Sequence, residues 1–435
     1  MKKILYHIFA LLLLTIALAS CGEDRTHEYL EKTEENQWIF NKMKEVYLWA
    51  DDIKQPERSL FFGTTSKFFT SLLNKNDKSS FFTDTISTGS YGLDFTLLRD
   101  PLGVKMNRYY ALVLFVRPGS PAEAAGIERG MWISGINGKT MTSTSGKQLL
   151  SGNAIEIATS VIEYDDENEK YYWATGDTIA IQQSRAFDSK AICLDTIYNV
   201  RSNKVGYIVC SNLCGDSFET EVQQTMLDFA TNDVTDIVID LRYCNEGTLE
   251  NANAMASMLV PASAIGTSFV TMKGNDEGTD SVCNYTEQPV NLSDKKLFFI
   301  TGNATKNIAE LLVASVNASR GMHEVQVVGE RSTGANVLTQ RFDSPYGYSI
   351  NPAVAFLYSS KGDELPSAGI PVDYPLYELN EIERVHTLGS EQEYILRNIQ
   401  YLIVNGVMPE ENSSPLKKTF RLHIKALALP VKGWR

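Results

Sequence analysis

Three short segments of the chain carry most of the residue types that nucleophilic chemistry uses. Catalysis by a hydroxyl requires the hydroxyl itself, a base that removes its proton, and donors that stabilise the oxyanion. Hydroxyls, a thiol, a lysine and carboxylates are all present in these segments. Which of them could act together depends on the exact position that each residue holds within its segment. The segments are Thr305-Lys306-Asn307-Ile308-Ala309-Glu310-Leu311-Leu312, Gly329-Glu330-Arg331-Ser332-Thr333-Gly334-Ala335 and Asp240-Leu241-Arg242-Tyr243-Cys244-Asn245-Glu246-Gly247.

The first two segments resemble the catalytic segments of the C-terminal-processing (tail-specific) serine peptidases. The family patterns are T-A-S-A-S-E-L, whose first serine of S-A-S-E is the nucleophile, and G-E-x-T-x-G-K, whose lysine is the general base. Aligned on Glu310-Leu311 and on Gly329-Glu330, the nucleophile position is Asn307 and the base position is Ala335. An amide cannot form an acyl-enzyme, and alanine has no titratable group.

The third segment resembles the family pattern D-L-R-x-N-x-G-G, whose glycine amides help to form the oxyanion hole. Gly247 matches the oxyanion-loop position, but Cys244 stands for the asparagine, and Asn245, Glu246 and Thr248 interrupt the glycines. With all three segments altered, no catalytic residue is intact and the chain is predicted to be inactive as a peptidase. The alternative is an active serine-type or altered-nucleophile peptidase that uses Thr305 or Cys244 in the cell envelope, with Lys306 and Ser332 nearby.

The N-terminus is typical of an exported lipoprotein. Met1-Lys2-Lys3 is followed by an apolar run from Ile4 to about Ala19, which reads as a signal peptide. Leu18-Ala19-Ser20-Cys21 resembles a bacterial lipobox, so Cys21 is the expected lipidation site and the membrane a partner through the anchor. A plain secretory signal is the alternative. We expect a lipid-anchored protein of the cell envelope, attached to the outer membrane and facing the periplasm or the surface.

Composition excludes several other classes of function. The formal net charge of −13 argues against a nucleic-acid partner, because phosphate binding needs clustered Lys and Arg. The five histidines have no metal-ligand spacing, so neither a metal nor a cofactor is expected. Without Cys21 an odd number of cysteines remains, which favours free thiols over a complete disulfide framework.

A β-rich segment resembles a PDZ domain. Its signature is Pro118-Gly119-Ser120-Pro121-Ala122-Glu123-Ala124-Ala125-Gly126-Ile127 followed by Gly130-Met131-Trp132-Ile133-Ser134-Gly135-Ile136-Asn137-Gly138. Ser120 is expected to cap a short helix that begins at Pro121, and Asn137-Gly138 to close a strand with a tight turn. A PDZ domain binds an extended peptide by strand addition. The resemblance places the peptide-binding loop at Tyr91, Gly92, Leu93 and Phe95; alternatively, the protein itself fills the groove.

Alternating strand and helix patterns after about Lys204 predict a largely parallel sheet with covering helices. The resemblance implies an α+β multidomain chain with a helical N-terminal leader, a PDZ-like β domain and an α/β crotonase-like (ββα spiral) peptidase-type domain. The expected boundaries are a signal peptide at 1–20, a linker at 21–36, the helical region at 37–87, the PDZ-like domain at 88–195, the peptidase-like domain at 196–380, and a C-terminal helix and tail at 381–435.

These expectations define the function to be tested. The leading hypothesis is a lipid-anchored, catalytically inactive relative of the tail-specific peptidases that binds peptide or protein segments, including C-termini, through the PDZ groove. Besides the altered-nucleophile peptidase, a surface-assembly or scaffold component with empty clefts remains an alternative.

Overall fold

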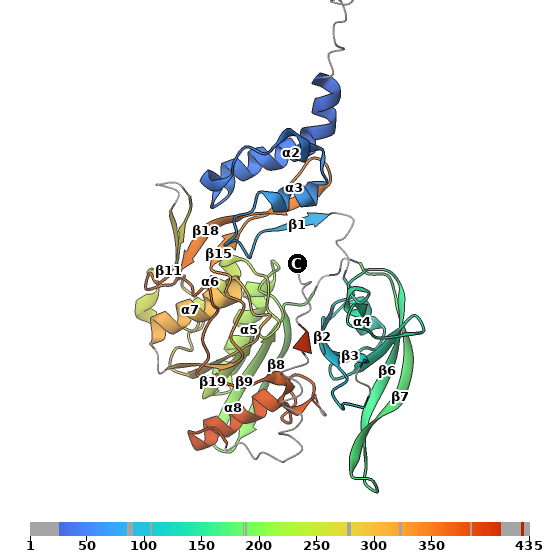
Figure 1. The fold of residues 1–435 in the computed structure, drawn as a ribbon. Coiled ribbons are helices and arrows are strands. Elements are labelled where there is room, and N and C mark those ends of the chain that lie inside the picture. The colour runs from blue at the N-terminus through green and yellow to red at the C-terminus, as the bar shows by residue number, and fades with distance from the viewer. Residues whose placement is uncertain are drawn as a thin grey trace, which may run out of the picture.

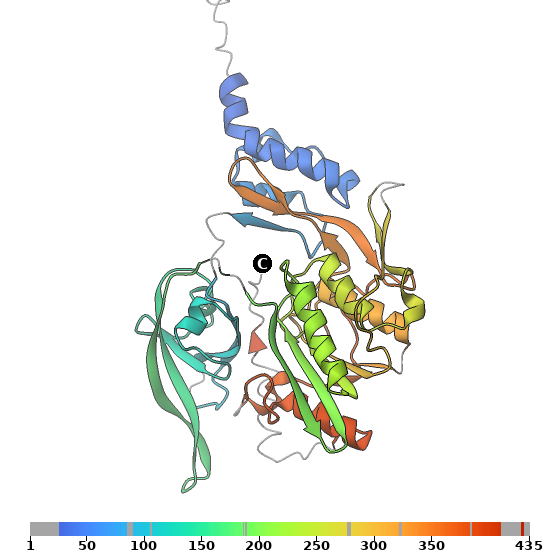
Figure 2. The same cartoon turned by 180° about the vertical axis from the view of Figure 1, so that it is seen from behind.

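The structure is a computed structural model that describes residues 26–84, 90–104, 107–185, 187, 189–275, 280–321, 324–382, 385–409 and 428–429. Three parts can be followed in Figures 1 and 2: an N-terminal helical region, a β-rich unit and an α/β unit. The β-rich unit (residues 90–185) lies to one side of the α/β unit (residues 192–409), and the N-terminal helical region (residues 26–84) lies at one end of the latter.

The α/β unit is built on a six-stranded sheet whose order is β19-β14-β13-β10-β9-β8. Every neighbouring pair is parallel except β8 with β9, which is antiparallel. Apolar residues alternate between its two faces, as the period of two in a strand requires. On β10, Ile237 and Ile239 point into one hydrophobic cluster and Val238 into the other. The strands are β8 (Ile192–Val200), β9 (Asn203–Cys210), β10 (Asp236–Asp240), β13 (Lys296–Thr301), β14 (Val325–Gly329) and β19 (Tyr374–Pro375).

Helices cover both faces of this sheet. Helices α5 (Phe218–Thr231), α6 (Leu249–Ser257) and α7 (Ile308–Arg320) bury their apolar sides in one cluster, and α8 (Tyr394–Asn405) packs on the opposite face. These elements coincide within a few residues with the strand and helix patterns in the sequence. Strand β8 begins at Ile192, so the sheet of the α/β unit starts a few residues before the expected boundary at 195.

The β-rich unit is formed by a second sheet with the order β20-β2-β3-β4-β6-β7, and β5 pairs with β4. Ser120 accepts the N–H of Glu123 at 3.1 Å and caps α4 (Pro121–Ala124), as expected. Asn137 and Gly138 have φ of 50° and 72°, the positive values that a tight hairpin turn requires. The strands are β2 (Leu93–Arg99), β3 (Tyr109–Val116), β4 (Trp132–Ile136), β5 (Lys139–Thr140), β6 (Ile155–Asp165), β7 (Lys170–Ile181) and β20 (Ala428–Leu429).

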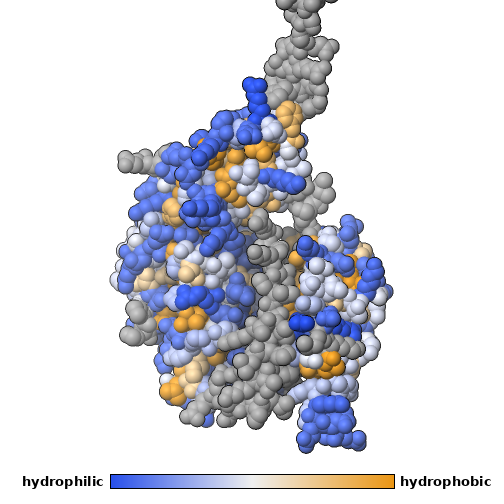
Figure 3. Space-filling view, viewed as in Figure 1, coloured by the Kyte–Doolittle hydropathy of each residue, from blue (hydrophilic) through white to orange (hydrophobic). Residues whose placement is uncertain are grey.

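The β6–β7 hairpin projects beyond the body of its unit (Figure 1), and its tip is hydrophilic in Figure 3. Acidic side chains account for this character, because Asp165, Asp166, Glu167 and Glu169 surround the turn. A polar tip of this kind requires no covering partner.

The N-terminal helical region differs in detail from the expected helical segment at 37–87. Helix α2 (Thr26–Val46) begins inside the expected linker, because Glu, Lys and Leu there are all good helix formers. Helix α3 (Thr65–Ser71) follows, and the segment ends in β1 (Phe81–Asp84), which pairs with β17 in a three-stranded sheet. The remaining strands are β11 (Ser268–Lys273), β12 (Ser281–Asn284), β15 (Val337–Thr339), β16 (Phe342–Asp343), β17 (Tyr348–Asn351) and β18 (Ala353–Tyr358).

No helix among the described residues is both long enough and apolar enough to cross a membrane. The expected signal peptide and Cys21 lie outside the described residues.

Candidate functional site

The nucleophile and base positions of the sequence analysis lie side by side. Oε2 of Glu310 accepts the backbone N–H of Asn307 at 2.9 Å and that of Ala335 at 2.8 Å. Its other oxygen, Oε1, accepts the N–H of Gly334 at 2.6 Å and the hydroxyl of Ser332 at 2.5 Å. Four donors therefore converge on a carboxylate that is only 2% exposed, and this carboxylate joins the start of α7 to the loop at Ser332–Ala335.

The oxyanion-loop segment joins the same site. The N–H of Lys306 donates to the carbonyl of Cys244 at 3.1 Å, and the hydroxyl of Thr305 donates to the carbonyl of Leu241 at 2.8 Å. A Cβ on Gly247 would lie 3.1 Å from Cγ2 of Ile308, so this glycine packs directly against the first residue of α7. All three segments thus meet around the N-terminus of α7.

Asn307 has an unusual backbone. Its φ of 56° and ψ of −111° lie outside the regions that non-glycine residues populate, and such a conformation costs on the order of 1–3 kcal/mol. A sharp, strained turn before a helix is how several hydrolases expose a nucleophile. Here the same position carries an amide, and the buried Oδ1 of Asn307 has no hydrogen-bond partner among the described residues. Asn307 therefore combines a strained backbone of this kind with an amide side chain.

None of the alternative nucleophiles is exposed. Thr305 is fully buried, and its hydroxyl both donates to Leu241 and accepts the N–H of Gly302 at 2.9 Å. Cys244 is also fully buried, and burial raises the pKa of its thiol well above the usual range although Arg117 opposes this effect. A thiol in this state is not a thiolate at neutral pH.

The hydroxyl of Ser332, in the same loop as Gly334 and Ala335, also has hydrogen-bond partners within the protein. Its hydroxyl donates to Glu310 and accepts the N–H of Ile370 at 2.6 Å, and the side chain is 6% exposed. The carboxylate that it contacts already accepts three backbone N–H groups, so it is poorly placed to act as a base. The hydroxyls and thiol of the site thus serve to hold the loops together.

Glu246, which could have opposed an oxyanion, is exposed to solvent, and its backbone carbonyl accepts the N–H of Leu213 at 2.9 Å. Asp240 and Arg242 of the same segment form a buried ion pair, with 2.6 Å between Nη2 and Oδ2. The pair supports the loop from within, because Arg242 also donates to Glu393 at 2.8 Å.

The sequence analysis did not find Glu310 as the centre of the site. Glu310 served only to align the first segment, although a Glu three residues after a helix N-cap is a recognisable signal for a carboxylate that turns back to the N-cap backbone. Arg129, Glu378 and Glu393 were also missed. They form a buried cluster with Arg242, and no local pattern connects them.

The expected peptide-binding loop is ordered around Gly92. This residue has a φ of 72°, and a Cβ there would lie 2.2 Å from Cβ of Ser120, so glycine is required for two reasons. Tyr91, Leu93 and Phe95 are 3%, 3% and 5% exposed, and all three pack in the hydrophobic core of the β-rich unit. Their side chains therefore support the loop from within the core.

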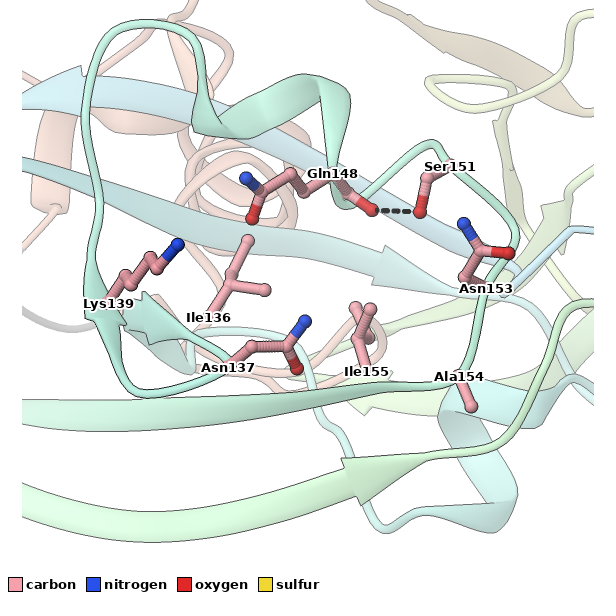
Figure 4. A pocket seen from close by; sticks show the side chains of 8 residues that line it. All are labelled: Ile136, Asn137, Lys139, Gln148, Ser151, Asn153, Ala154 and Ile155. Atoms are coloured by element: carbon pink, nitrogen blue, oxygen red, sulfur yellow. Dashed lines mark hydrogen bonds between the residues drawn. The ribbon is translucent and has the colours of Figure 1, made fainter.

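A pocket of about 330 Å³ does lie on the β-rich unit (Figure 4). It is lined by the β4–β5 turn and by residues 148–155, with Ile136 and Ile155 between the polar side chains of Asn137, Lys139 and Gln148. Tyr91 reaches its border, because its hydroxyl donates to the carbonyl of Asn153. The pocket is open, and its lining combines polar side chains with the apolar surface of Ile136, Ala154 and Ile155.

Asp94 points away from the core of the β-rich unit, towards the α/β unit. Its Oδ2 lies 3.6 Å from Nη2 of Arg117, and Arg117 donates to the backbone carbonyls of Ser211 and Tyr243 at 3.2 and 3.5 Å. Burial raises the pKa of Asp94 to about 6, and the charge of Arg117 opposes this rise. Arg117 thus connects Asp94, in the expected binding loop, to the backbone of Tyr243 in the oxyanion-loop segment.

Within the described part of the chain, no group of three or more His, Cys, Asp or Glu side chains is placed to hold a metal ion. Five cysteines are free thiols; Cys210 and Cys244 are buried, and Cys193, Cys214 and Cys283 are partly exposed.

The fold and the meeting of three loops at a strained helix start define a multidomain α/β protein with a peptidase-type domain. Comparison with known proteins gives the family. Residues 204–376 match the model of Peptidase family S41, and residues 34–83 match the Peptidase S41 N-terminal domain. The chain belongs to peptidase family S41, the family of the tail-specific peptidases that its motifs resemble.

A carboxyl-terminal-processing protease of Picosynechococcus sp. is 23% identical over 265 residues, which are 60% of this chain and 59% of that protein. The chain therefore spans less than two thirds of the curated relative that it matches. A solved structure from Bacteroides fragilis, assigned to the S41 proteases, has a TM-score of 0.73 at 23% identity and covers 86% of this chain and 98% of its own. That likeness supports the fold alone. The photosystem II D1 C-terminal processing protease has a TM-score of 0.49 at 16% identity over 83% of this chain and 98% of its own.

Proposed function

We propose that this chain is a lipid-anchored cell-envelope member of peptidase family S41 that has lost peptidase chemistry and binds peptide or protein segments. One observation carries the proposal: the same Glu310 oxygen accepts the backbone N–H groups of Asn307 and Ala335. The nucleophile and base positions are therefore adjacent in space, as the family mechanism needs, but they hold an amide and a methyl group. A misaligned sequence would not be expected to bring these two positions together. Their adjacency therefore supports the alignment that assigns Asn307 and Ala335 to the nucleophile and base positions.

The burial of the neighbouring hydroxyl and thiol groups supports the loss of chemistry. Thr305, Cys244 and Ser332 each have hydrogen-bond partners within the protein and no open approach for a peptide carbonyl. A nucleophile must lie within about 3–3.5 Å of the reacting atom, which a fully buried side chain cannot do without local opening.

The binding function is assigned to the β-rich unit, which we interpret as a PDZ-like domain. Three features support this interpretation: the Gly92 loop at the start of β2, the Ser120-capped helix α4 beside it, and the turn at Asn137-Gly138. Strand addition to β2 is the binding mode that such a domain uses. The Asp94–Arg117 pair links this strand to the backbone of Tyr243 in the altered site. A peptide bound to the strand can therefore affect the position of that segment.

The lipid anchor rests on Leu18-Ala19-Ser20-Cys21. Cys21→Ala should release the protein from membranes or block its maturation, because Cys21 is the residue expected to carry the acyl chains. The experiment is membrane fractionation of wild type and variant, with mass spectrometry of the mature N-terminus. A variant that stays in the membrane with normal processing contradicts the anchor.

Peptide binding and proteolysis are tested on the same preparation. Fluorescent peptides with apolar C-termini are titrated into the full chain, and a casein-like unfolded protein is incubated with it for many hours. We expect weak binding that is lost in Gly92→Val, and no cleavage. Val at position 92 would collide with Ser120 at a backbone angle that β-branched residues avoid.

A matched control for Gly92→Val is Gly138→Val. Gly138 also has a positive φ of 72° in the same unit, but a Cβ there meets nothing within 4 Å. Equal loss of binding in both variants would indicate a general folding defect, and binding that survives Gly92→Val would place the peptide site elsewhere. Cleavage by the wild type would favour the alternative, a peptidase with an altered nucleophile.

A further inference from the structure

The sheet of the β-rich unit begins with a strand from the far end of the chain. Strand β20 pairs antiparallel with β2, with Leu429 opposite Leu97 and Ala428 opposite Leu98. In Figures 1 and 2 this short red arrow lies beside β2, between the two larger units. Without β20, β2 would be the edge of its sheet and would present unpaired N–H and C=O groups.

Strand β2 is also the strand that follows the Gly92 loop, where strand addition of a peptide is proposed. We propose that the β2 edge is a strand-addition site whose resident ligand is the tail of the same chain around Ala428–Leu429, so that an external peptide binds by displacing the tail. This inference rests on the proposed peptide-binding function and adds a competitor that regulates it.

The chemistry of the tail suits an occupant that can be displaced. Two residues pair with β2, and the next residue, Pro430, has no backbone N–H to donate. A ladder this short is marginal by itself. The sequence around it alternates apolar residues at Leu427, Leu429 and Val431, a pattern typical of a strand.

Charge favours association of the tail with the rest of the protein. From residue 413 to residue 435 there are six Lys or Arg residues and no Asp or Glu. The whole chain has 40 basic and 53 acidic residues, so the remainder carries 34 − 53 = −19. A positive segment is attracted to such a body at moderate ionic strength. The six residues are Lys417, Lys418, Arg421, Lys425, Lys432 and Arg435.

Tethering strengthens a weak contact. The tail is joined to the α/β unit through residues 410–427, and for short linkers the effective concentration of a tethered ligand is on the order of millimolar. An external peptide of micromolar intrinsic affinity would then bind the full chain much more weakly than a chain without the tail.

The first measurement tests the position of the tail without any added peptide. Hydrogen–deuterium exchange is recorded on the full chain in detergent, on a variant that ends at Pro409, and on the full-length double variant Ala428→Pro/Leu429→Pro. We expect the β2 amides among Thr96–Arg99 that do not pair with β3 to exchange on the order of ten-fold faster in both variants. The full-length variant Ser413→Pro, which adds a proline outside β20, should exchange like wild type.

The second measurement tests displacement. A fluorescent peptide with the sequence of residues 424–435 is titrated into the same proteins. We expect it to bind the variant ending at Pro409 and the double-proline variant about ten-fold more tightly, or better, than it binds the wild type. A peptide with proline at both positions 428 and 429 is the matched control and should not bind.

The two measurements separate the inference from the function on which it rests. If β2 exchanges faster in both variants but no peptide binds, the tail contact with β2 is supported and the peptide-binding function is overturned. Unchanged β2 exchange in the double-proline variant would overturn the tail contact, whatever the peptide does. If the variant ending at Pro409 does not fold, the double-proline variant decides both questions.

Discussion

Arg129 of the β-rich unit and Glu378 of the α/β unit form a buried ion pair, with 2.5 Å between Nη1 and Oε1 and side-chain exposures of 6% and 10%. The same guanidinium donates to the hydroxyl of Tyr243 at 3.0 Å, and Tyr243 stacks on Phe115 with ring centroids 4.9 Å apart. Two residues of the β-rich unit therefore contact Tyr243, which precedes Cys244 in the oxyanion-loop segment.

Replacing Arg129 by Gln should therefore destabilise the protein strongly. Removing one partner of a buried charge cluster leaves the others uncompensated, which costs on the order of 3–5 kcal/mol. Thermal unfolding of the variant should show a large fall in Tm. Arg341→Gln is the control, because the Arg341–Asp343 pair is more than half exposed and such pairs contribute about 1 kcal/mol or less. Similar Tm values for the two variants would mean that Arg129 does not hold the units together.

Replacing Glu310 by Gln should open the altered site. The carboxylate accepts four hydrogen bonds, three of them from backbone N–H groups, and an amide offers one oxygen and two unwanted donors. We expect a loss of at least about 3 kcal/mol in the free energy of unfolding, since hydrogen bonds to charged groups contribute about 1.5–3 kcal/mol each. The readout is chemical denaturation together with exchange of the Asn307, Gly334 and Ala335 amides.

Glu324→Gln provides the comparison for Glu310→Gln. Glu324 lies just beyond α7 with its side chain 59% exposed, so its substitution should change stability by less than about 1 kcal/mol. A small effect of Glu310→Gln, close to that of Glu324→Gln, would show that the carboxylate is not the centre of the site.

The carboxyl group of Asp94 should give a distinct pH dependence. Burial raises its pKa from 3.8 to about 6, with Arg117 opposing the shift and Glu378 adding to it. Well below pH 3.8 the group is protonated in both the folded and the unfolded chain, so it contributes no difference. Between about pH 4 and pH 6 the unfolded chain ionises first, and stability falls by about 3 kcal/mol in total.

Asp94→Asn removes this loss. The variant should become progressively more stable than wild type as the pH rises from 4 to 6, and the difference should stay constant from pH 7 upwards. Measuring Tm of both proteins from pH 4 to pH 8 checks this. Parallel curves over the whole range would mean that the folded protein does not perturb Asp94.

Restoring single groups should not restore proteolysis. Loss of the nucleophile or base of a serine protease costs on the order of 10⁶ in rate, and Asn307→Ser alone would lack a base. The double variant Asn307→Ser/Ala335→Lys should recover at most a trace, because position 335 is 3% exposed beside Glu310, which would hold the new ammonium. The assay is cleavage of an unfolded protein and labelling with a serine-reactive probe.

The wild type and Asn307→Ala serve as references for that assay, and both should be silent. Clear cleavage by the wild type that survives Asn307→Ala would contradict the inactive assignment. Loss of that cleavage in Cys244→Ala or Thr305→Ala would then identify the replacement nucleophile.

Local chemistry alone determines much of this protein. The alternating strand and helix patterns, the Ser120 cap and the turn at Asn137-Gly138 depend on residues within a few positions of one another, so they are legible in the sequence. The assignment of Asn307 and Ala335 to motif positions also depends only on their immediate neighbours in the sequence. The same short motifs were sufficient to predict membership of the S41 family.

Tertiary structure decided which of these residues act together. Glu310 connects Asn307 to Ala335, Arg242 meets Glu378 at a separation of 136 positions, and β20 reaches β2 across most of the chain. Such contacts are set by how the sheets and helices pack, and no periodicity records them. The side chains of Leu93 and Phe95 illustrate the limit, since their apolar character fits a binding groove and a core equally well, and only packing placed them in the core.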